Sequence, residues 1–288
     1  MTPLRQKMID AMLVRGFSVR TQRSYLDAVC QLAKHTHCSP DTLKTEQLQD
    51  YFLYLVKQRQ LSPASCRLYL NGIRFLYLQV LGWNTFDIEL HTPKRAQRIP
   101  ELLSRQEVAR ILCACQNVKH RVMLTTCYAC GLRVSELVAL QVKQIDSDRH
   151  VLRIEQAKGA KDRQVILTDP LLYLLRWYWQ RYRPVQWLFY GRDLNHGLSI
   201  TSAQKVFKRS KQRAGINKVG GIHSLRHAYA THQLEAGMPV YQLQRLLGHN
   251  NLQSTMRYVH WVPKVQPGVG VDLLAGLDLL DGLEVRHD

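Results

Sequence analysis

Apolar residues recur at three- and four-residue intervals through residues 3–82, which is the pattern of amphipathic helices. No alternating strand pattern interrupts them, and Gly82 ends the last helical stretch. Pro63 favours a helix start because proline suits the first helical position. Residues 1–90 are therefore predicted to form a small four-helix domain. Three residues are predicted to cap helices in this domain: Ser18, Thr45 and Ser62.

Residues 91–102 break the helical pattern and are predicted to be a linker. Pro93 and Pro100 exclude a continuous helix. Lys94, Arg95 and Arg98 make the segment basic. A contact with a polyanion and a merely solvated connector explain this charge equally well.

A second domain is predicted over residues 103–264, beginning with capping-box spacing at Ser104 and Glu107. The period then changes, and two short strands are predicted at 150–155 and 163–167, joined by a glycine-containing turn. The predicted fold is mainly α: a four-helix domain followed by an α+β domain with a small antiparallel sheet. Helices of the second domain are expected at 122–130, 133–140, 170–181, 202–214, 224–236, 240–247 and 252–259.

The charge of the chain predicts a polyanionic partner. The 288 residues include 40 Lys+Arg and 22 Asp+Glu, a formal net charge of +18. Residues 1–92 carry 11 basic and 7 acidic residues, residues 93–264 carry 28 and 10, and residues 265–288 carry 1 and 5. The excess therefore lies on the linker and second domain. Nucleic acid is a better match for it than a membrane surface.

Other classes are excluded or disfavoured by composition. No apolar run approaches the ~18–20 residues that span a bilayer, and no secretory signal is visible, so a cytoplasmic protein is expected. The seven cysteines are an odd number and indicate reduced thiols. Four of them have spacings that resemble a zinc site but fall in apolar helical patterns, where buried thiols are the better interpretation: Cys113, Cys115, Cys127 and Cys130.

The acidic tail, residues 265–288, contains a six-residue repeat beginning at Asp272 and Asp278. Its leucines require burial, yet its glycines make it a poor helix. The tail is interpreted either as a frayed end or as a segment that docks on its own body or on a neighbouring protomer.

Six polar residues of the second domain together suit chemistry on a phosphodiester. Each has an ordinary explanation when it is considered separately, such as an ion pair between Arg133 and Glu136. As a set they supply a nucleophile and fixed cations for a transition state whose charge gathers on phosphate oxygens. Arginine forks bind two oxygens at once. The six are Arg133, Lys158, His223, Arg226, His249 and Tyr258.

The ordered motifs around these residues resemble those of the tyrosine site-specific recombinases, the phage-integrase family. The motifs are Gly-Leu-Arg-Val-Ser-Glu-Leu from Gly131, Lys-Gly-Ala-Lys-Asp-Arg from Lys158, His-Ser-Leu-Arg-His from His223, Leu-Gly-His ending at His249, and Tyr258 nine residues later. The resemblance covers about residues 3–262 and includes Xer-, integron- and transposon-type members. It implies an N-terminal SAM-like core-binding domain and a catalytic domain.

The resemblance also implies a role for each residue. Tyr258 attacks the scissile phosphate and forms a 3′-phosphotyrosine, while Arg133, Arg226 and His249 hold the phosphate. Lys158 is the general acid, with Lys161 as the nearer rival, and His223 assists proton transfer with the tyrosine. Neither a metal nor another cofactor is required. Glu136 is expected either to orient the region of Arg133 or to lie on the surface.

The implied partner is double-stranded DNA with inverted-repeat core sites, bound by a homotetramer on two duplexes. Strands would be exchanged through a Holliday junction, and the free protein would be a monomer or weak oligomer. A type IB topoisomerase-like strand transferase and a non-catalytic DNA-binding regulator are the alternatives; a zinc hydrolase using His223 and His227 lacks the glutamate that its motif requires. Candidate DNA contacts are Arg20, Arg23, Arg67, Arg74, Lys205, Lys208 and Arg209.

Overall fold

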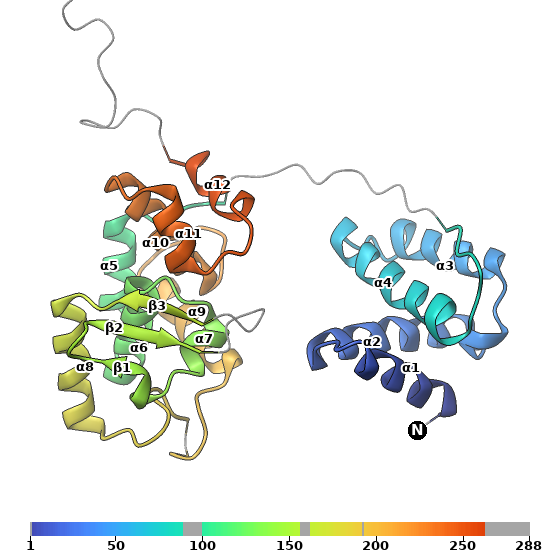
Figure 1. The fold of residues 1–288 in the computed structure, drawn as a ribbon. Coiled ribbons are helices and arrows are strands. Elements are labelled where there is room, and N and C mark those ends of the chain that lie inside the picture. The colour runs from blue at the N-terminus through green and yellow to red at the C-terminus, as the bar shows by residue number, and fades with distance from the viewer. Residues whose placement is uncertain (1, 89–99, 156–161, 192, 263–288) are drawn as a thin grey trace, which may run out of the picture. The chain divides into compact units, whose positions relative to one another are not determined.

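The computed structural model describes residues 2–88, 100–155, 162–191 and 193–262. The chain divides into two compact units, Met1–Arg98 and Ile99–Asp288, which are considered separately here (Figure 1). The described residues are mostly helical with one small antiparallel sheet, so the predicted fold class is confirmed. None of the described helices is long and apolar enough to cross a membrane. The predicted tail and most of the predicted linker lie outside the described residues.

The first unit is built from helices whose starts are encoded locally. Ser18 and Ser62 accept hydrogen bonds from backbone N–H groups of the first turn, as predicted. Thr45 is not a cap: the N-cap is Lys44, and Thr45 is the first helical residue. The elements are α1 (Pro3–Val14), α2 (Val19–Thr36), a 3-10 turn (Pro40–Thr42), α3 (Thr45–Lys57), α4 (Pro63–Phe75) and a π-helical turn (Leu76–Val80).

Helices α2 and α4 pack closely because a glycine lies where they meet. A Cβ at Gly72 would lie 3.1 Å from the Tyr25 Cα and 3.2 Å from the Ala28 Cβ. The core beneath them is apolar and aromatic, with Leu32, Phe52 and Tyr77 among its buried side chains. Burial of these side chains stabilises the unit, since its described residues form helices but no strand and its cysteines are free.

The second unit contains a three-stranded antiparallel sheet of order β1-β2-β3. Its strands are β1 (Ile145–Asp146), β2 (Val151–Ile154) and β3 (Arg163–Ile166). The sequence pattern predicts only two strands, because β1 has two residues and is too short to show alternation. The helices are α5 (Arg105–Cys113), α6 (Val118–Ala129), α7 (Val134–Val138), a 3-10 turn (Val142–Gln144), α8 (Asp169–Tyr182), α9 (Ile200–Arg213), α10 (His223–Glu235), α11 (Val240–Leu247) and α12 (Gln253–Val259).

The register of β2 and β3 directs an arginine into the protein. Ile154 pairs with Arg163, and Leu152 pairs with Val165. Alternation in β3 therefore places Arg163 and Val165 on the buried face and Gln164 on the exposed face. Helices α10, α11 and α12 lie together, and α11 packs against β3 (Figure 1). This arrangement brings an inward-facing charge of the sheet to the helices that carry the predicted site.

The start of the second unit follows its sequence signals. Ser104 accepts a hydrogen bond from the Glu107 N–H, and the Glu107 carboxylate accepts one from the Ser104 N–H, so the predicted capping box is confirmed. The helix expected over 133–140 is only the five-residue α7. It begins directly after Arg133, which becomes its N-cap residue.

Candidate active site

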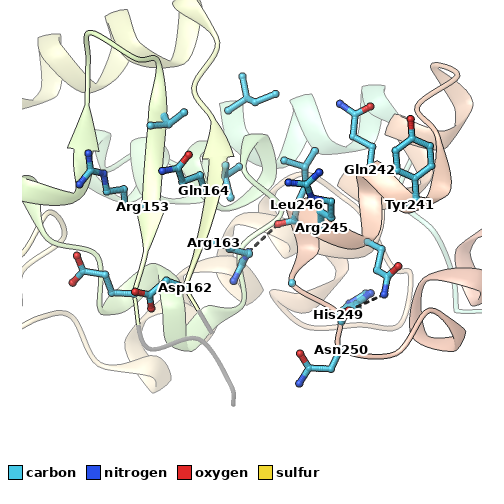
Figure 2. Close-up of a pocket in the computed structure, with 16 residues that line it drawn as sticks. Arg153, Asp162, Arg163, Gln164, Tyr241, Gln242, Arg245, Leu246, His249 and Asn250 are labelled. Carbon is cyan, nitrogen blue, oxygen red and sulfur yellow. Dashed lines mark hydrogen bonds between the residues drawn. The ribbon is translucent and has the colours of Figure 1, made fainter. Parts of the chain in front are cut away.

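A cleft of about 1170 Å³ opens between the sheet and α11. Figure 2 shows Arg153 and Gln164 on its sheet side, Arg245 on its α11 side, and His249 and Asn250 beyond the end of α11. Glu155 and Asp162 also line it. Lys158 and Lys161 come between these two residues in the sequence and lie outside the described residues.

Glu136 is the anionic centre of the site. Its carboxylate accepts hydrogen bonds from the Arg163 guanidinium at 2.8 and 2.7 Å and from the Arg133 guanidinium at 2.7 Å. The Glu136 side chain is only 6% exposed, so the surface role considered for it is wrong. Burial raises the pKa of Glu136, but the hydrogen bonds and charge of Arg163, followed by Arg133, outweigh it and lower this pKa to about 2. Glu136 is therefore an anion throughout the physiological range.

Arg163 is a structural member of the site that the sequence analysis missed. Besides its two bonds to Glu136, it donates to the Leu246 carbonyl at 2.8 Å, as Figure 2 shows. Gly248 makes room for it, since a Cβ there would lie 2.8 Å from the Arg163 Cδ. Gly248 also has a φ of +62°, which favours glycine. The Arg163 side chain thus ties β3 to the end of α11, immediately before His249.

Arg133 is positioned by the chain reversal at Gly131. This glycine has a φ of +56°, and a Cβ on it would lie 2.4 Å from the Tyr229 ring. Arg133 donates to Glu136 and also to the Gly248 carbonyl, at 3.2 Å. Its side chain is 23% exposed and so keeps access to a ligand.

Arg226 is the most deeply buried charge of the site, at 1% exposure. It donates to the carbonyls of Gly131 at 2.8 Å and Leu247 at 2.7 Å, which fixes the plane of its guanidinium. Burial and then Arg133 lower the pKa of Arg226 to about 10, so it remains charged at neutral pH. It lies 3.9 Å from the Glu136 carboxylate, which partly compensates this charge.

His249 has a defined tautomer in this network. The Arg226 guanidinium is a hydrogen-bond donor with no acceptor atom, so it donates to the His249 Nε2 at 3.0 Å. The His249 proton therefore lies on Nδ1, which donates to the Thr255 hydroxyl at 2.8 Å. Burial and then the Arg226 charge lower the pKa of His249 to about 4, so the ring is neutral. Thr255 is a further supporting residue that the motifs did not reveal.

Tyr258 lies on α12 beside these groups and is only 4% exposed. Its ring is parallel to the His249 ring at 6.3 Å and meets Trp261 edge-on at 5.1 Å. Burial raises the pKa of Tyr258, and the Arg226 and Arg133 charges oppose that effect. The hydroxyl is 3.0 Å from the His227 Nδ1, a contact that the sequence analysis did not predict.

His223 is exposed at the start of α10, and its ring meets the His227 ring edge-on at 4.6 Å. Burial, followed by the charges of Arg226 and Arg133, lowers the pKa of His223. The described part of the chain contains no group of three or more His, Cys, Asp or Glu that could hold a metal. Cys115, Cys127 and Cys130 are buried as predicted, but Cys113 is exposed at the end of α5, so the prediction of a buried thiol is wrong there. Burial raises the pKa of Cys127 and of Cys130 to about 12.

The seven candidate DNA-contact residues are all exposed. They lie on three helices: Arg20 and Arg23 on α2, Arg67 and Arg74 on α4, and Lys205, Lys208 and Arg209 on α9. In the second unit, Lys208 also lines a smaller cavity of about 510 Å³ that reaches His223. A basic surface thus extends to the edge of the candidate site within this unit.

Two family models match the chain. Residues 101–264 match the phage integrase family, and residues 4–85 match the N-terminal SAM-like domain of phage integrases. The chain belongs to the phage integrase family and is a tyrosine recombinase, an enzyme of site-specific DNA cleavage and rejoining.

Individual relatives agree with this family. The putative integrase/recombinase y4qK of Sinorhizobium fredii is 42% identical over 261 residues, covering 90% of this chain and 84% of that protein. The tyrosine recombinase XerD of Listeria innocua is 32% identical over 253 residues, covering 82% and 83%. The fold is similar to a Tn1549 transposon integrase in complex with circular intermediate DNA, with a TM-score of 0.68, 16% identity and coverage of 90% and 95%. It is also similar to the XerH recombinase in a post-cleavage complex with its difH substrate, with a TM-score of 0.69, 20% identity and coverage of 87% and 79%.

Proposed function

We propose that Tyr258 is the nucleophile of this recombinase and that it forms a transient 3′-phosphotyrosine bond with DNA. The Tyr258 oxygen forms a bond to phosphorus while the bond from phosphorus to the 5′ oxygen breaks. Lys158 gives the leaving oxygen its proton, and His223 assists removal of the tyrosine proton. The covalent bond conserves the phosphodiester energy, so rejoining by the 5′-hydroxyl reverses the step without ATP or a metal.

Arg133, Arg226 and His249 are proposed to hold the scissile phosphate. The observation that carries this assignment is that Arg226 hydrogen-bonds His249, while the Tyr258 ring is parallel to His249. Arg226 is fixed by two carbonyls and therefore needs little reorganisation when charge develops on the phosphate. An incoming phosphate would also raise the pKa of His249, since an anion favours its protonated form.

The proposed substrate is duplex DNA with inverted-repeat core sites, and the proposed assembly is a tetramer on two duplexes with a Holliday-junction intermediate. The N-terminal domain, residues 1–90, and the catalytic domain would hold the duplex together. The seven basic residues would contact mainly phosphates. The proposed division into a linker over 91–102, a catalytic domain over 103–264 and a tail over 265–288 belongs to this hypothesis.

Covalent capture tests the proposal. Nicked duplexes from the DNA that flanks the gene are incubated with the protein in EDTA, and denaturant-resistant adducts are isolated. The wild-type protein should become linked to a DNA 3′ end, and Tyr258→Phe should form no adduct, since it lacks only the hydroxyl. An undiminished adduct in Tyr258→Phe would contradict the assignment. Tyr190→Phe, which removes a hydroxyl elsewhere in the same unit, is the matched control and should keep wild-type activity.

A further inference from the structure

The Tyr258 hydroxyl has a neighbour that the motif-based assignment gives no role. The His227 Nδ1 lies 3.0 Å from it, and the two rings are 5.6 Å apart. His227 follows Arg226 on α10, and its ring also meets those of His223 and Trp261 edge-on. It therefore lies between His223 and Tyr258 and is held there by aromatic contacts on two sides.

His227 and Tyr258 are both neutral at neutral pH, so the direction of this hydrogen bond depends on the tautomer of His227. Burial, followed by the His223 and Arg226 neighbours, lowers the pKa of His227 to about 4, so at neutral pH one ring nitrogen carries no proton. The pKa of Tyr258 is raised above that of an ordinary phenol, so its hydroxyl keeps its proton. The other tautomer, with the His227 proton on Nδ1, would turn the hydroxyl hydrogen toward the Arg226 and Arg133 cations. We therefore assign the His227 proton to Nε2, so that the hydroxyl donates to Nδ1. Its oxygen lone pairs remain available toward the cationic side of the site, where a phosphate would enter.

We propose that His227 is a positioning residue for the nucleophile: by accepting the Tyr258 proton in a hydrogen bond, it fixes the direction in which the hydroxyl oxygen faces the phosphate. The proposal rests on the assignment of Tyr258 as the nucleophile. The His223 ring contacts the His227 ring, and in this proposal His223 assists proton removal from the neighbouring position.

His227 is unsuited to be the base that finally keeps the proton. With a pKa of about 4 against a phenol above its usual value near 10, complete transfer in the free protein has an equilibrium constant below about one in a million. Orientation has a larger effect here, because a misplacement of 1 Å costs about 10²-fold in rate. The ring packing of Tyr258 against Trp261 fixes the phenol plane, and the hydrogen bond to His227 fixes its hydroxyl.

The test compares three variants in single-turnover adduct formation on the captured duplex. His227→Ala removes the acceptor and should slow cleavage by about 10²-fold, with DNA affinity within about twofold of wild type. His227→Asn places an amide oxygen near the former Nδ1 and should recover most of that loss. His232→Ala is the matched control: His232 also lies on α10 and its Nδ1 is 2.9 Å from the Tyr128 hydroxyl, so it removes a similar bond away from the site.

A substrate with sulfur in place of the bridging 5′ oxygen separates positioning from acid catalysis. A thiolate leaves without a proton, so this substrate should restore cleavage by Lys158→Ala. It should not restore cleavage by His227→Ala, because the nucleophile is still misdirected. The cleavage rate of His227→Asn should also keep the wild-type pH profile, which a lost general base would change.

A DNA-free measurement keeps this inference separate from the proposed function. With tyrosines labelled at Cζ by ¹³C, the Tyr258 signal, assigned through Tyr258→Phe, should shift in His227→Ala and not in His232→Ala. Absence of any wild-type adduct would overturn the proposed function while this signal still tests the hydrogen bond. Wild-type cleavage by His227→Ala, or an Asn variant as slow as the Ala variant, would overturn the positioning role.

Discussion

Glu136 provides a sharp test of how the site is stabilised. Replacing it with Gln keeps the side-chain shape but removes the carboxylate shared by Arg163 and Arg133. A pKa of about 2 in place of the usual 4.5 corresponds to about 3 kcal/mol of stability at neutral pH. Removing one partner of a buried ion pair generally costs about 3–5 kcal/mol, because the other charge is left buried without compensation. The two figures describe the same interaction and are not added. Glu136→Gln should therefore lower the free energy of unfolding by about 3 kcal/mol.

The stability difference between wild type and Glu136→Gln should decrease as the pH is lowered. The folded-state pKa of Glu136 is below its unfolded-state value, so the stabilisation is fully present above about pH 5 and is lost as the pH falls toward 2. At pH 3.5 about 1.4 kcal/mol of the difference between wild type and Glu136→Gln should have disappeared. Titrations that the two proteins share cancel in this comparison.

Urea unfolding of the full chain, followed by tryptophan fluorescence, measures the effect. Four of the five tryptophans report on the second unit: Trp177, Trp179, Trp187 and Trp261. Asp146→Asn removes one charge of the partly exposed pair with Arg153 and is the matched control, with a much smaller expected loss of stability than Glu136→Gln. A surface substitution usually changes the free energy of unfolding by no more than about 0.5 kcal/mol. A change no larger than this in Glu136→Gln at pH 7 would refute this account. So would a stability difference that does not shrink in acid.

Three further predictions concern the chain reversal, a cap and the DNA surface. Gly131→Ala should lower the unfolding midpoint and slow cleavage, because a Cβ would meet the Tyr229 ring at 2.4 Å; a variant with wild-type stability would contradict the predicted clash. Ser104→Ala should cost about 1 kcal/mol in urea unfolding by removing the cap of α5, and Ser104→Asp, which can still cap, should recover most of it. Lys208→Gln should weaken DNA binding at every sequence and reduce the slope of log affinity against log salt by about 0.9; an unchanged slope would show that Lys208 makes no phosphate contact.

Local sequence signals were sufficient for most of the architecture. Ser18, Ser62 and Ser104 mark helix starts through hydrogen bonds within a few residues, so they can be recognised without the rest of the fold. The errors occurred where local signals are weak. Thr45 and the preceding Lys44 compete for one capping position, and the two-residue β1 acquires its identity only by pairing with β2.

The site divides in the same way. The spacing of the motifs selected Arg133, His223, Arg226, His249 and Tyr258, because a chemical constellation in a fixed order is visible in one dimension. The contacts between them are not visible in that way. Arg226 and His249 lie 23 positions apart, and their hydrogen bond exists only because α10 packs against α11.

What the sequence determined by itself was the helical composition, the separation into two units and the concentration of positive charge, and its motifs supplied the proposed set of reactive residues. What only the tertiary structure decided was the direction of individual side chains. The sequence analysis gave Arg163 no role of its own, but the register of β3 turns its side chain inward onto Glu136, 27 positions away. In the sequence, His227 is only the residue that follows Arg226. The packing of α12 on α10 brings its ring to the Tyr258 hydroxyl. Arg163 is buried and His227 is half-buried, so water competes weakly with the partners of both groups.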